Sequence, residues 1–287
     1  MIGLPESINV QRRSRRTHSG TALLVVLAGA ILGIAALWAT APQLFTAYSG
    51  TVGVPGAQLR APGAEHWLGT DELGRDVLAR IIYGARYTLS GAFVAVSVGF
   101  VAGGLLGLVA GAVGGWLEQI LMRVVDVMLA IPELLLALAF VLILGFGHTQ
   151  VAIAVGITSV ATFARLMRSE VVTVRQADYV EAAFGSGGRF LSVLWRHILP
   201  NSLTSVLALA ALQFGSAILQ ISTLGFLGYG APPPTPEWGL LIAEGRNYMM
   251  TAWWLTLFPG LAVIALGLAA NQIGIALGRE SGERPHA

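Results

Sequence analysis

Long apolar runs with almost no charge alternate with short polar stretches along the whole chain. An α-helix needs about 20 apolar residues to cross the hydrocarbon core of a lipid bilayer. Six runs approach or exceed this length, at residues 21–41, 88–113, 120–144, 149–167, 202–222 and 252–276. The pattern therefore predicts an all-α membrane protein with six transmembrane helices. Only Gly114, Gly115, Trp116 and Glu118 separate the second run from the third.

The polar stretches define the tails and loops around these spans. Residues 1–20 precede the first span, residues 42–86 form a turn-rich segment after it, and residues 279–287 follow the last. A secretory signal peptide is the competing interpretation of residues 21–41. The apolar run is long for a signal peptide and no convincing cleavage site accompanies it, so we expect an uncleaved membrane anchor.

Arginine is distributed unevenly between the two sides of the predicted bundle. All 17 basic residues are arginine, and 12 of them fall on one side when six spans alternate across the bilayer. Cytoplasmic loops carry the excess of basic residues. We therefore expect residues 1–20 and 279–287 to be cytoplasmic tails, residues 42–86 to be extracytoplasmic, and residues 87–278 to form the transmembrane core.

Composition excludes several classes of protein. The chain is 55% hydrophobic and 11% charged, whereas a soluble domain carries about 25% charged residues. It has no cysteine, and its five histidines are scattered, so no metal site is predicted. It also has no lysine, which a phosphate-binding P-loop requires. A net charge of +2 gives no indication of a nucleic-acid partner. No catalytic residue and no cofactor are predicted within this chain.

One polar segment between the fourth and fifth spans has a distinctive sequence, DYVEAAFGSGGRFLSVLWRHILPN, at residues 178–201. It resembles the EAA motif of bacterial ABC importer permeases, the cytoplasmic loop by which a membrane subunit grips its ATPase. The resemblance implies ATPase-coupling roles for Asp178, Tyr179, Glu181, Ala182, Ala183, Gly187, His197 and Pro200. Phe184 departs from the pattern, because the family commonly has arginine there. We call residues 178–201 the coupling loop.

Local signals predict two short helices in the coupling loop. Residues 179–184 form the first, with Asp178 as its N-cap, and the glycines that follow turn the chain. Residues 190–198 form an amphipathic second helix, with Leu191, Leu194, Trp195 and Ile198 on one side. We expect Pro200 to break that helix and Asn201 to cap the next span. An ordinary loop with a membrane-surface helix is the alternative interpretation.

Other segments extend the resemblance over about residues 65–278. They are LGTDELGRD at 68–76, MRVVDVMLAIP at 122–132, LGFLGYGAPPPTPEWG at 224–239 and residues 271–274. They resemble the C-type subunit of the dipeptide, oligopeptide and nickel class of these permeases. The resemblance implies a type I ABC importer permease (MetI-like) core in the bacterial inner membrane, preceded by an extra N-terminal helix. The tail GRESGERPHA departs from the family pattern.

The same resemblance implies a set of partners. They are a homologous B-type permease subunit, two ATPase subunits that bind ATP and magnesium, an extracytoplasmic solute-binding protein and the lipid bilayer. The substrate it implies is a di- or oligopeptide, with a nickel chelate or another small solute as the alternative. Two other classes remain open: a proton-coupled secondary transporter that uses Asp126 and Glu133, and a membrane anchor without a pathway.

Charged and small residues within the predicted spans are the remaining candidates. Glycine recurs at every fourth position from Gly99 to Gly115, which indicates close helix packing or a sliding seam at the pathway. Arg123 and Asp126 have the spacing of a helical ion pair. Glu133 lies deeper in its span, where a charge is costly and marks a functional site by default. It either lines the pathway and meets a peptide amino group or faces the partner subunit or a polar pocket.

The extracytoplasmic candidates are Asp71, Arg75, Asp76, Pro234 and Trp238. The first three belong to the LGTDELGRD motif. The motif indicates either an outer-face gate or contact with the solute-binding protein, or a simple surface helix that starts near Asp76 and pairs it with Arg80. Pro234 and Trp238 belong to a stiff, proline-rich stretch at residues 231–239. That stretch either contacts the binding protein or supplies an interfacial aromatic residue.

Overall fold

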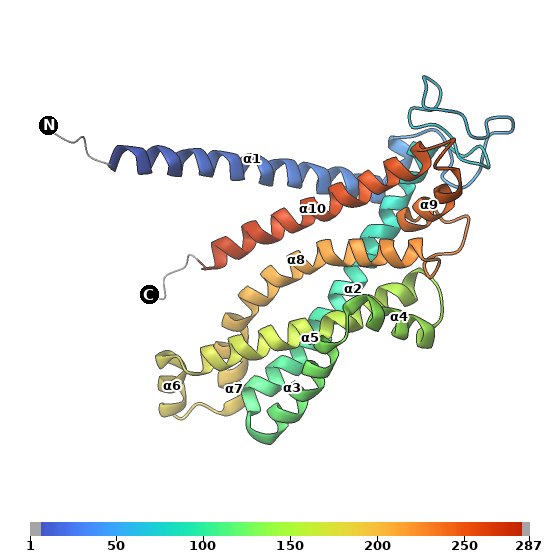
Figure 1. Ribbon diagram of the computed structural model, residues 1–287. Helices are drawn as coiled ribbons and strands as arrows, with labels where there is room; N and C mark the ends of the chain where they lie inside the picture. The colour runs from blue at the N-terminus through green and yellow to red at the C-terminus, as the bar shows by residue number, and fades with distance from the viewer. Residues whose placement is uncertain (1–6, 283–287) are drawn as a thin grey trace.

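A computed structural model describes residues 7–282, with side chains described for residues 22–278. Residues 1–6 and 283–287, the ends of the two predicted tails, lie outside the described residues. Within the described range the regular elements are helices (Figure 1). The longer ones are α1 (Ser7–Thr40), α2 (Val77–Val113), α3 (Gly115–Ala130), α4 (Glu133–Leu144), α5 (His148–Arg175), α8 (Leu199–Phe226) and α10 (Trp254–Gly282).

Five helices are long and apolar enough to cross a membrane, and the broken pair α3 and α4 makes a sixth candidate. This agrees with the predicted all-helical bundle. The predicted third span, however, is not one straight helix, because α3 and α4 are bent by 101° at residues 131–132. Pro132 causes the break: it donates no backbone hydrogen bond and disfavours helical geometry at Ile131, whose backbone is extended.

The second span begins earlier than the apolar run predicts. α2 is 37 residues long and starts at Val77, so the segment between the first two helices ends at Asp76 rather than near residue 86. The Asp76 carboxylate caps the helix by accepting a 2.7 Å hydrogen bond from the Ala79 amide. At the other end, Gly114 and Gly115 have φ values of 72° and 66° and turn the chain into α3. The predicted division between these two spans is therefore confirmed.

The glycine stripe packs α2 directly on α5. A Cβ atom on Gly103 would lie 2.5 Å from the Val160 carbonyl oxygen, and one on Gly99 would lie 2.9 Å from the Ser159 Cβ atom. Gly107 and Gly111 face α5 in the same way. The stripe therefore serves close packing inside this subunit, as small residues do in membranes, and Gly115 belongs to the turn instead.

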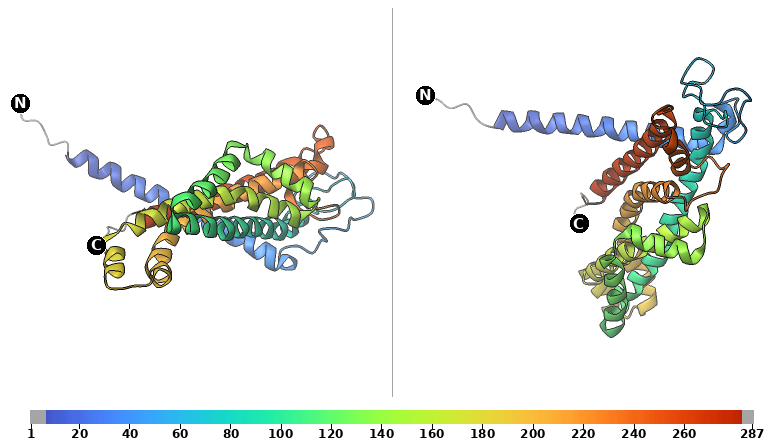
Figure 2. Two further views of the ribbon diagram at one scale, coloured as in Figure 1. Left: turned by 90° about the horizontal axis from the view of Figure 1, so that it is seen from below. Right: turned by 45° about the vertical axis from the view of Figure 1, so that its right-hand side comes forward.

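The helices run between two opposite ends of the molecule (Figures 1 and 2). α5, α8 and α10 lie roughly side by side, α2 crosses them, and α1 packs on α10 and α2. The N-terminal end of α1 and the C-terminal end of α10 lie at the same end of the molecule as the coupling loop. Residues 42–76 and the short helix α9 (Trp238–Gly245) lie at the other end. We call residues 42–76 together with α9 the cap.

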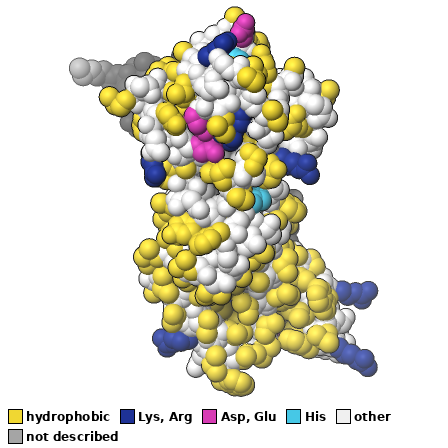
Figure 3. All heavy atoms as spheres, turned by 90° about the vertical axis from the view of Figure 1, so that its right-hand side faces the viewer, with side chains coloured by type: hydrophobic (Ala, Val, Ile, Leu, Met, Phe, Trp, Pro, Cys, Tyr) yellow, Lys and Arg dark blue, Asp and Glu magenta, His cyan; other side chains and the backbone are white. Residues whose placement is uncertain are grey.

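The surface carries an apolar band. Figure 3 shows acidic side chains gathered at the upper end of one face, with apolar and uncharged groups across its middle. Large apolar side chains such as Leu142 and Ile143 are 66% and 78% exposed. A soluble monomer rarely exposes contiguous apolar surface of this extent. The apolar band is therefore typical of a surface that contacts lipid.

Candidate functional site

The coupling loop forms a bracket at the end of α5. α6 (Asp178–Gly185) runs to a turn at Gly187, whose φ of 87° is readily adopted only by glycine. The chain then enters α7 (Phe190–Val193) and returns into α8. The predicted N-cap is wrong by one position: Ala177 precedes α6, and Asp178 lies in its first turn with Glu181. Acidic side chains there stabilise the positive end of the helix.

A small apolar core holds the bracket on α5. Val180, Val193 and Ile198 are buried and belong to one cluster with Met167 and Val171 of α5. Phe184 packs against the same cluster. An apolar residue therefore fits the position where the related pattern has arginine. The bracket and α5 therefore share one packed core.

The second half of the coupling loop departs from the predicted geometry. Leu194–Ile198 form a π-helix that runs straight into α8, so Pro200 does not break the helix but lies in the first turn of α8. The Asn201 side chain donates a 2.6 Å hydrogen bond to the His197 carbonyl rather than capping a span. The wider π-turn disrupts the 3.6-residue spacing. Leu191 and Trp195, predicted to share one side with Leu194 and Ile198, are 65% and 59% exposed, whereas Leu194 and Ile198 are buried.

Most of the predicted coupling residues lie on the surface of the bracket. Asp178, Tyr179, Glu181, Ala182, Gly187 and Pro200 are exposed, whereas Ala183 and His197 are half-buried. Leu191 and Trp195 add apolar area to this surface. The result is a polar surface with aromatic and aliphatic side chains at the end of the bundle, suited to contact with another protein.

Charged side chains line the face formed by α3 and α5. Asp126 accepts a 2.6 Å hydrogen bond from Arg165 of α5, so the predicted pair with Arg123 is wrong. Glu118 accepts from the Arg168 Nε atom at 2.7 Å. The residues Glu118, Arg123, Asp126, Arg165 and Arg168 border an open cavity of about 620 Å³.

Glu133 lies at the bend between α3 and α4. It is the first residue of α4 and is exposed. It borders a second cavity, of about 380 Å³, together with Pro132, Thr158 and Thr162. No ion pair of Glu133 is found within the described part of the chain. An acidic side chain without a partner at this level of a membrane protein is a functional-site candidate.

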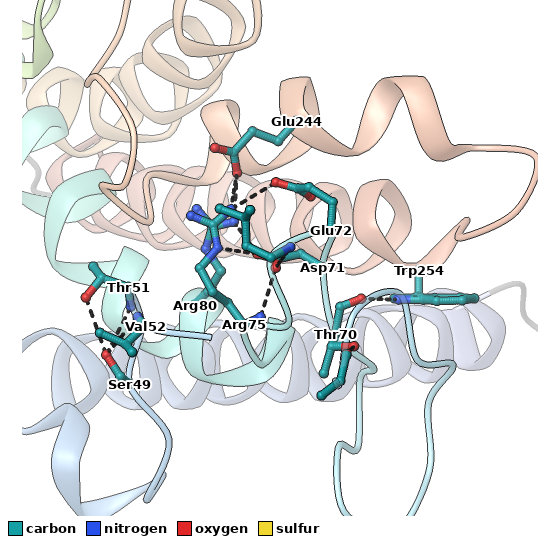
Figure 4. Close-up of polar contacts among 12 residues, drawn as sticks. Ser49, Thr51, Val52, Thr70, Asp71, Glu72, Arg75, Arg80, Glu244 and Trp254 are labelled. Carbon is teal, nitrogen blue, oxygen red and sulfur yellow. Dashed lines mark hydrogen bonds and ion pairs between the residues drawn. The ribbon is translucent and has the colours of Figure 1, made fainter. Parts of the chain in front are cut away.

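The cap holds a buried ion network (Figure 4). Asp71 receives hydrogen bonds from Arg75 at 2.6 Å and Arg80 at 2.8 Å, and Arg80 also donates to Glu244 of α9 at 2.7 Å. Asp71, Arg75 and Arg80 are at most 3% exposed. Glu72 lies beside Arg75, and burial raises the pKa of its carboxyl group. The network joins the start of α2 to α9 across 164 residues of sequence.

Asp76 belongs to the same interior. It pairs with buried His66 at 2.9 Å, so the predicted pair between Asp76 and Arg80 is wrong. Because Asp71, Arg75 and Asp76 bond to groups of their own chain, they do not present a surface to a partner as predicted. The helix predicted to start near Asp76 does begin there.

The proline-rich stretch leads into α9. Pro234 is exposed, but Trp238 is only 1% exposed and donates a 2.9 Å hydrogen bond to the Ile81 carbonyl. Trp238 is therefore neither an outer contact nor an interfacial aromatic residue. Glu237, 1% exposed, caps α9 by accepting from the Gly239 and Leu240 amides. Burial raises the pKa of Glu237 to about 7, against the opposing effect of these two hydrogen bonds.

The comparison with protein families bears directly on this geometry. Residues 103–279, which include the coupling loop, match the family described as "binding-protein-dependent transport system inner membrane component". The chain belongs to this family of membrane permease subunits. The permease is 44% identical over 220 residues to the dipeptide transport system permease protein DppC of Alkalihalophilus pseudofirmus, covering 77% of this chain and 72% of the relative.

A second relative and a solved structure agree with the assignment. The permease is 42% identical over 213 residues to the glutathione transport system permease protein GsiD of Pectobacterium atrosepticum, covering 74% and 71% of the two chains. Its fold resembles the inward-facing MetNI methionine ABC transporter with a TM-score of 0.57 at 16% identity, over 70% of this chain and 96% of the other. The predicted importer-permease core is therefore confirmed.

Several residues of the permease's sites carry weak signals in the sequence. Glu244 meets its partners only through the fold, since Arg80 lies 164 positions away. Glu237, directly before the first residue of α9, has the position of an N-cap, which is a local signal. His66 has no such signal.

The family match gives no support to the two other classes, which are proton-coupled transport through Asp126 and Glu133 and a membrane anchor without a pathway.

Proposed function

We propose that this permease is the C-type membrane subunit of an ATP-driven importer for di- or oligopeptides. The observation that carries the proposal is the exposed coupling loop seated on an apolar core that continues into α5. The named relatives, which are dipeptide and glutathione permeases, support a peptide substrate. One subunit of this kind forms half of a translocation pathway, and a homologous B-type subunit forms the other half.

The proposed location is the inner membrane of a bacterium, with both tails and the coupling loop in the cytoplasm. Two observations support this orientation. The N-terminal end of α1 and the C-terminal end of α10 lie at the same end of the molecule as the coupling loop (Figure 1). Most arginines fall on that side of the bundle. Basic residues are retained on the cytoplasmic side. The cap then lies outside, where Pro234 is available to a solute-binding protein.

The proposed mechanism is alternating access driven by partner subunits. Two ATPases bind ATP with magnesium and close together, and each grips one coupling loop. Val180, Val193 and Ile198 carry that movement to α5, and the glycine contact between α5 and α2 passes it to α2. The pathway turns outward to receive a peptide from the binding protein and resets after hydrolysis. This chain supplies no catalytic residue and is not itself an enzyme.

The decisive experiment reverses one charge on the coupling loop. Glu181→Arg is compared with the wild type in the reconstituted complex of both permease subunits and both ATPases. We expect assembled membrane subunits with lost ATPase binding, or with lost solute-stimulated ATP hydrolysis. Glu65→Arg is the matched control, because Glu65 is an exposed acid in the cap at the opposite end. Normal ATPase binding and stimulated hydrolysis in Glu181→Arg would overturn the proposal.

A further inference from the structure

The break between α3 and α4 opens a cavity against the middle of α5. About 380 Å³ in volume, it is bordered by residues 128–133, Leu136, Thr158 and Thr162. Small-molecule sites have volumes of about 300–1,000 Å³. Thr158 and Thr162 lie near the middle of α5, so the cavity is far from both ends of that helix. Its size and position suit part of a small solute in transit.

The groups around the cavity favour a positive charge. α3 ends here at Ala130, and the last carbonyls of a helix have no partner within it and carry its negative end. The Glu133 carboxylate adds a full negative charge. The Thr158 hydroxyl donates to the Val155 carbonyl at 2.7 Å, which leaves its oxygen as an acceptor. Carbonyl, carboxylate and hydroxyl oxygens thus meet at one site, a pattern that broken membrane helices use for cations.

A metal ion fits these groups less well than an organic ammonium. Calcium takes six to eight oxygen ligands, usually with several carboxylates. The cavity has one carboxylate, and the described residues contain no cluster of three or more acidic, histidine or cysteine side chains able to hold a metal. An ammonium group has a single charge and three donors, which one carboxylate and neighbouring neutral acceptors satisfy.

We propose that Glu133, with the carbonyl end of α3 and the Thr158 hydroxyl, forms a subsite for the charged amino group of the transported solute. The subsite rests on the proposed importer function and adds a selection for amines within the membrane subunit. The adjoining face of α3 and α5 carries further charged residues around the 620 Å³ cavity. Charged groups are costly in lipid, so this face lies against the pathway, the partner subunit or the cytoplasm.

Glu133 also has a structural alternative. It lies in the first turn of α4, where any acidic side chain stabilises the helix. A purely structural glutamate would change helix stability on substitution without discriminating between cations and anions in the cavity. Selection by charge therefore separates the two roles.

The test places a reporter thiol in the cavity. The chain has no cysteine, so Thr162→Cys introduces the only thiol of this subunit, and it is studied in a complex whose other subunits are engineered to carry no accessible cysteine. Its reaction rates with a cationic and an anionic methanethiosulfonate reagent are measured in nanodiscs. A carboxylate within several ångströms changes local ion concentrations strongly at low dielectric. We expect the cationic-to-anionic rate ratio to fall about tenfold or more when Glu133→Gln is added.

Glu118→Gln is the matched control. Glu118 is an acid on the same face, bordering the neighbouring cavity and paired with Arg168. We expect it to leave the rate ratio at Thr162→Cys unchanged. An unchanged ratio in Glu133→Gln, or an equal change in Glu118→Gln, would overturn the subsite.

Protection by solutes tests the ligand class. Alanyl-alanine should slow labelling of Thr162→Cys when Glu133 is present and protect at least fivefold less in Glu133→Gln. Lactyl-alanine, which has a hydroxyl group in place of the amine, should not protect either form. Equal protection by the two solutes would overturn the proposal. Failure of the peptide-importer function alone would appear differently: the reagent ratio would still depend on Glu133, but alanyl-alanine would not stimulate ATP hydrolysis.

Discussion

The coupling loop and the cap treat charged residues in opposite ways. In the coupling loop, Asp178 and Glu181 are exposed and only a few apolar side chains hold the bracket in place. In the cap, Asp71 and Arg75 are buried and, with Arg80 at the start of α2, hold the segment together. Both regions are polar motifs of similar appearance in the sequence. Polar character in the sequence therefore does not distinguish an exposed binding surface from a buried ion network.

The difference follows from what each region must do. A surface that takes up and transmits the movement of another protein needs exposed groups on a well-packed base. A short polar segment that covers the end of a helix bundle has few apolar residues with which to build a core. Buried ion pairs with additional hydrogen bonds then fix its geometry, and losing one partner is costly. We expect substitutions in the cap to affect stability and those in the coupling loop to affect coupling.

Arg75→Ala should have the largest effect on stability. It leaves Asp71, Glu72 and Glu244 with Arg80 as the remaining cation of the network. Removing one partner of a buried ion pair costs about 3–5 kcal/mol. Thermal unfolding of the purified complex measures the loss. Arg60→Ala is the control, since Arg60 forms an exposed pair with Glu65 and should cost well under 1 kcal/mol. Similar losses in both variants would contradict the role given to the network.

Gly103→Ala tests the link between the two regions, because α2 starts directly after residue 76 of the cap and α5 leads into the coupling loop. The added Cβ atom would lie 2.5 Å from the Val160 carbonyl oxygen and force the helices apart. Overpacking of this kind costs about 1–3 kcal/mol. Gly104→Ala is the adjacent control, since no atom lies within 4 Å of its added Cβ. Stability and stimulated ATP hydrolysis should both fall in the first variant alone.

The buried Glu237 predicts a dependence of cap stability on pH. Its pKa is raised from 4.5 to about 7 because burial disfavours the charged form, so the folded protein binds the proton more tightly than the unfolded chain. The resulting stabilisation is complete below pH 4.5 and is lost as pH rises through about 7. Between pH 5 and 8 the change amounts to about 2 kcal/mol.

Glu237→Gln removes this titration and keeps one oxygen acceptor for α9, whereas the two oxygens of Glu237 accept separately from the Gly239 and Leu240 amides. The difference in melting temperature between pH 5 and 8 should therefore be smaller in the variant than in the wild type. Equal differences would show that Glu237 is not the titrating group.

The sequence predicts the helices of this molecule better than it predicts its contacts. The lengths of the apolar runs identify the spans, because a helix that crosses a bilayer must satisfy its backbone hydrogen bonds internally. The bend at Pro132 has a local cause, although continuous hydropathy across residues 120–144 conceals it. The contacts that hold the cap in place have no local signal in the sequence. Arg80 bonds to Glu244 across 164 residues, and Trp238 bonds to Ile81 across 157 residues. The π-helix at residues 194–198 likewise has no signal in the pattern of apolar residues.

The smallest effect on stability is expected on the coupling loop, at Trp195. The side chain is 59% exposed because the π-helix turns it away from the apolar core. Trp195→Ala should change the free energy of unfolding by no more than about 0.5 kcal/mol. It should nevertheless weaken ATPase binding about tenfold, since exposed tryptophans are frequent anchors in protein interfaces. Val193→Ala, at a position 2% exposed in the same loop, is the opposite case: it should lower stability first. If Trp195→Ala destabilised the subunit as much as Val193→Ala, the separation between an exposed coupling surface and the packed base beneath it would not hold.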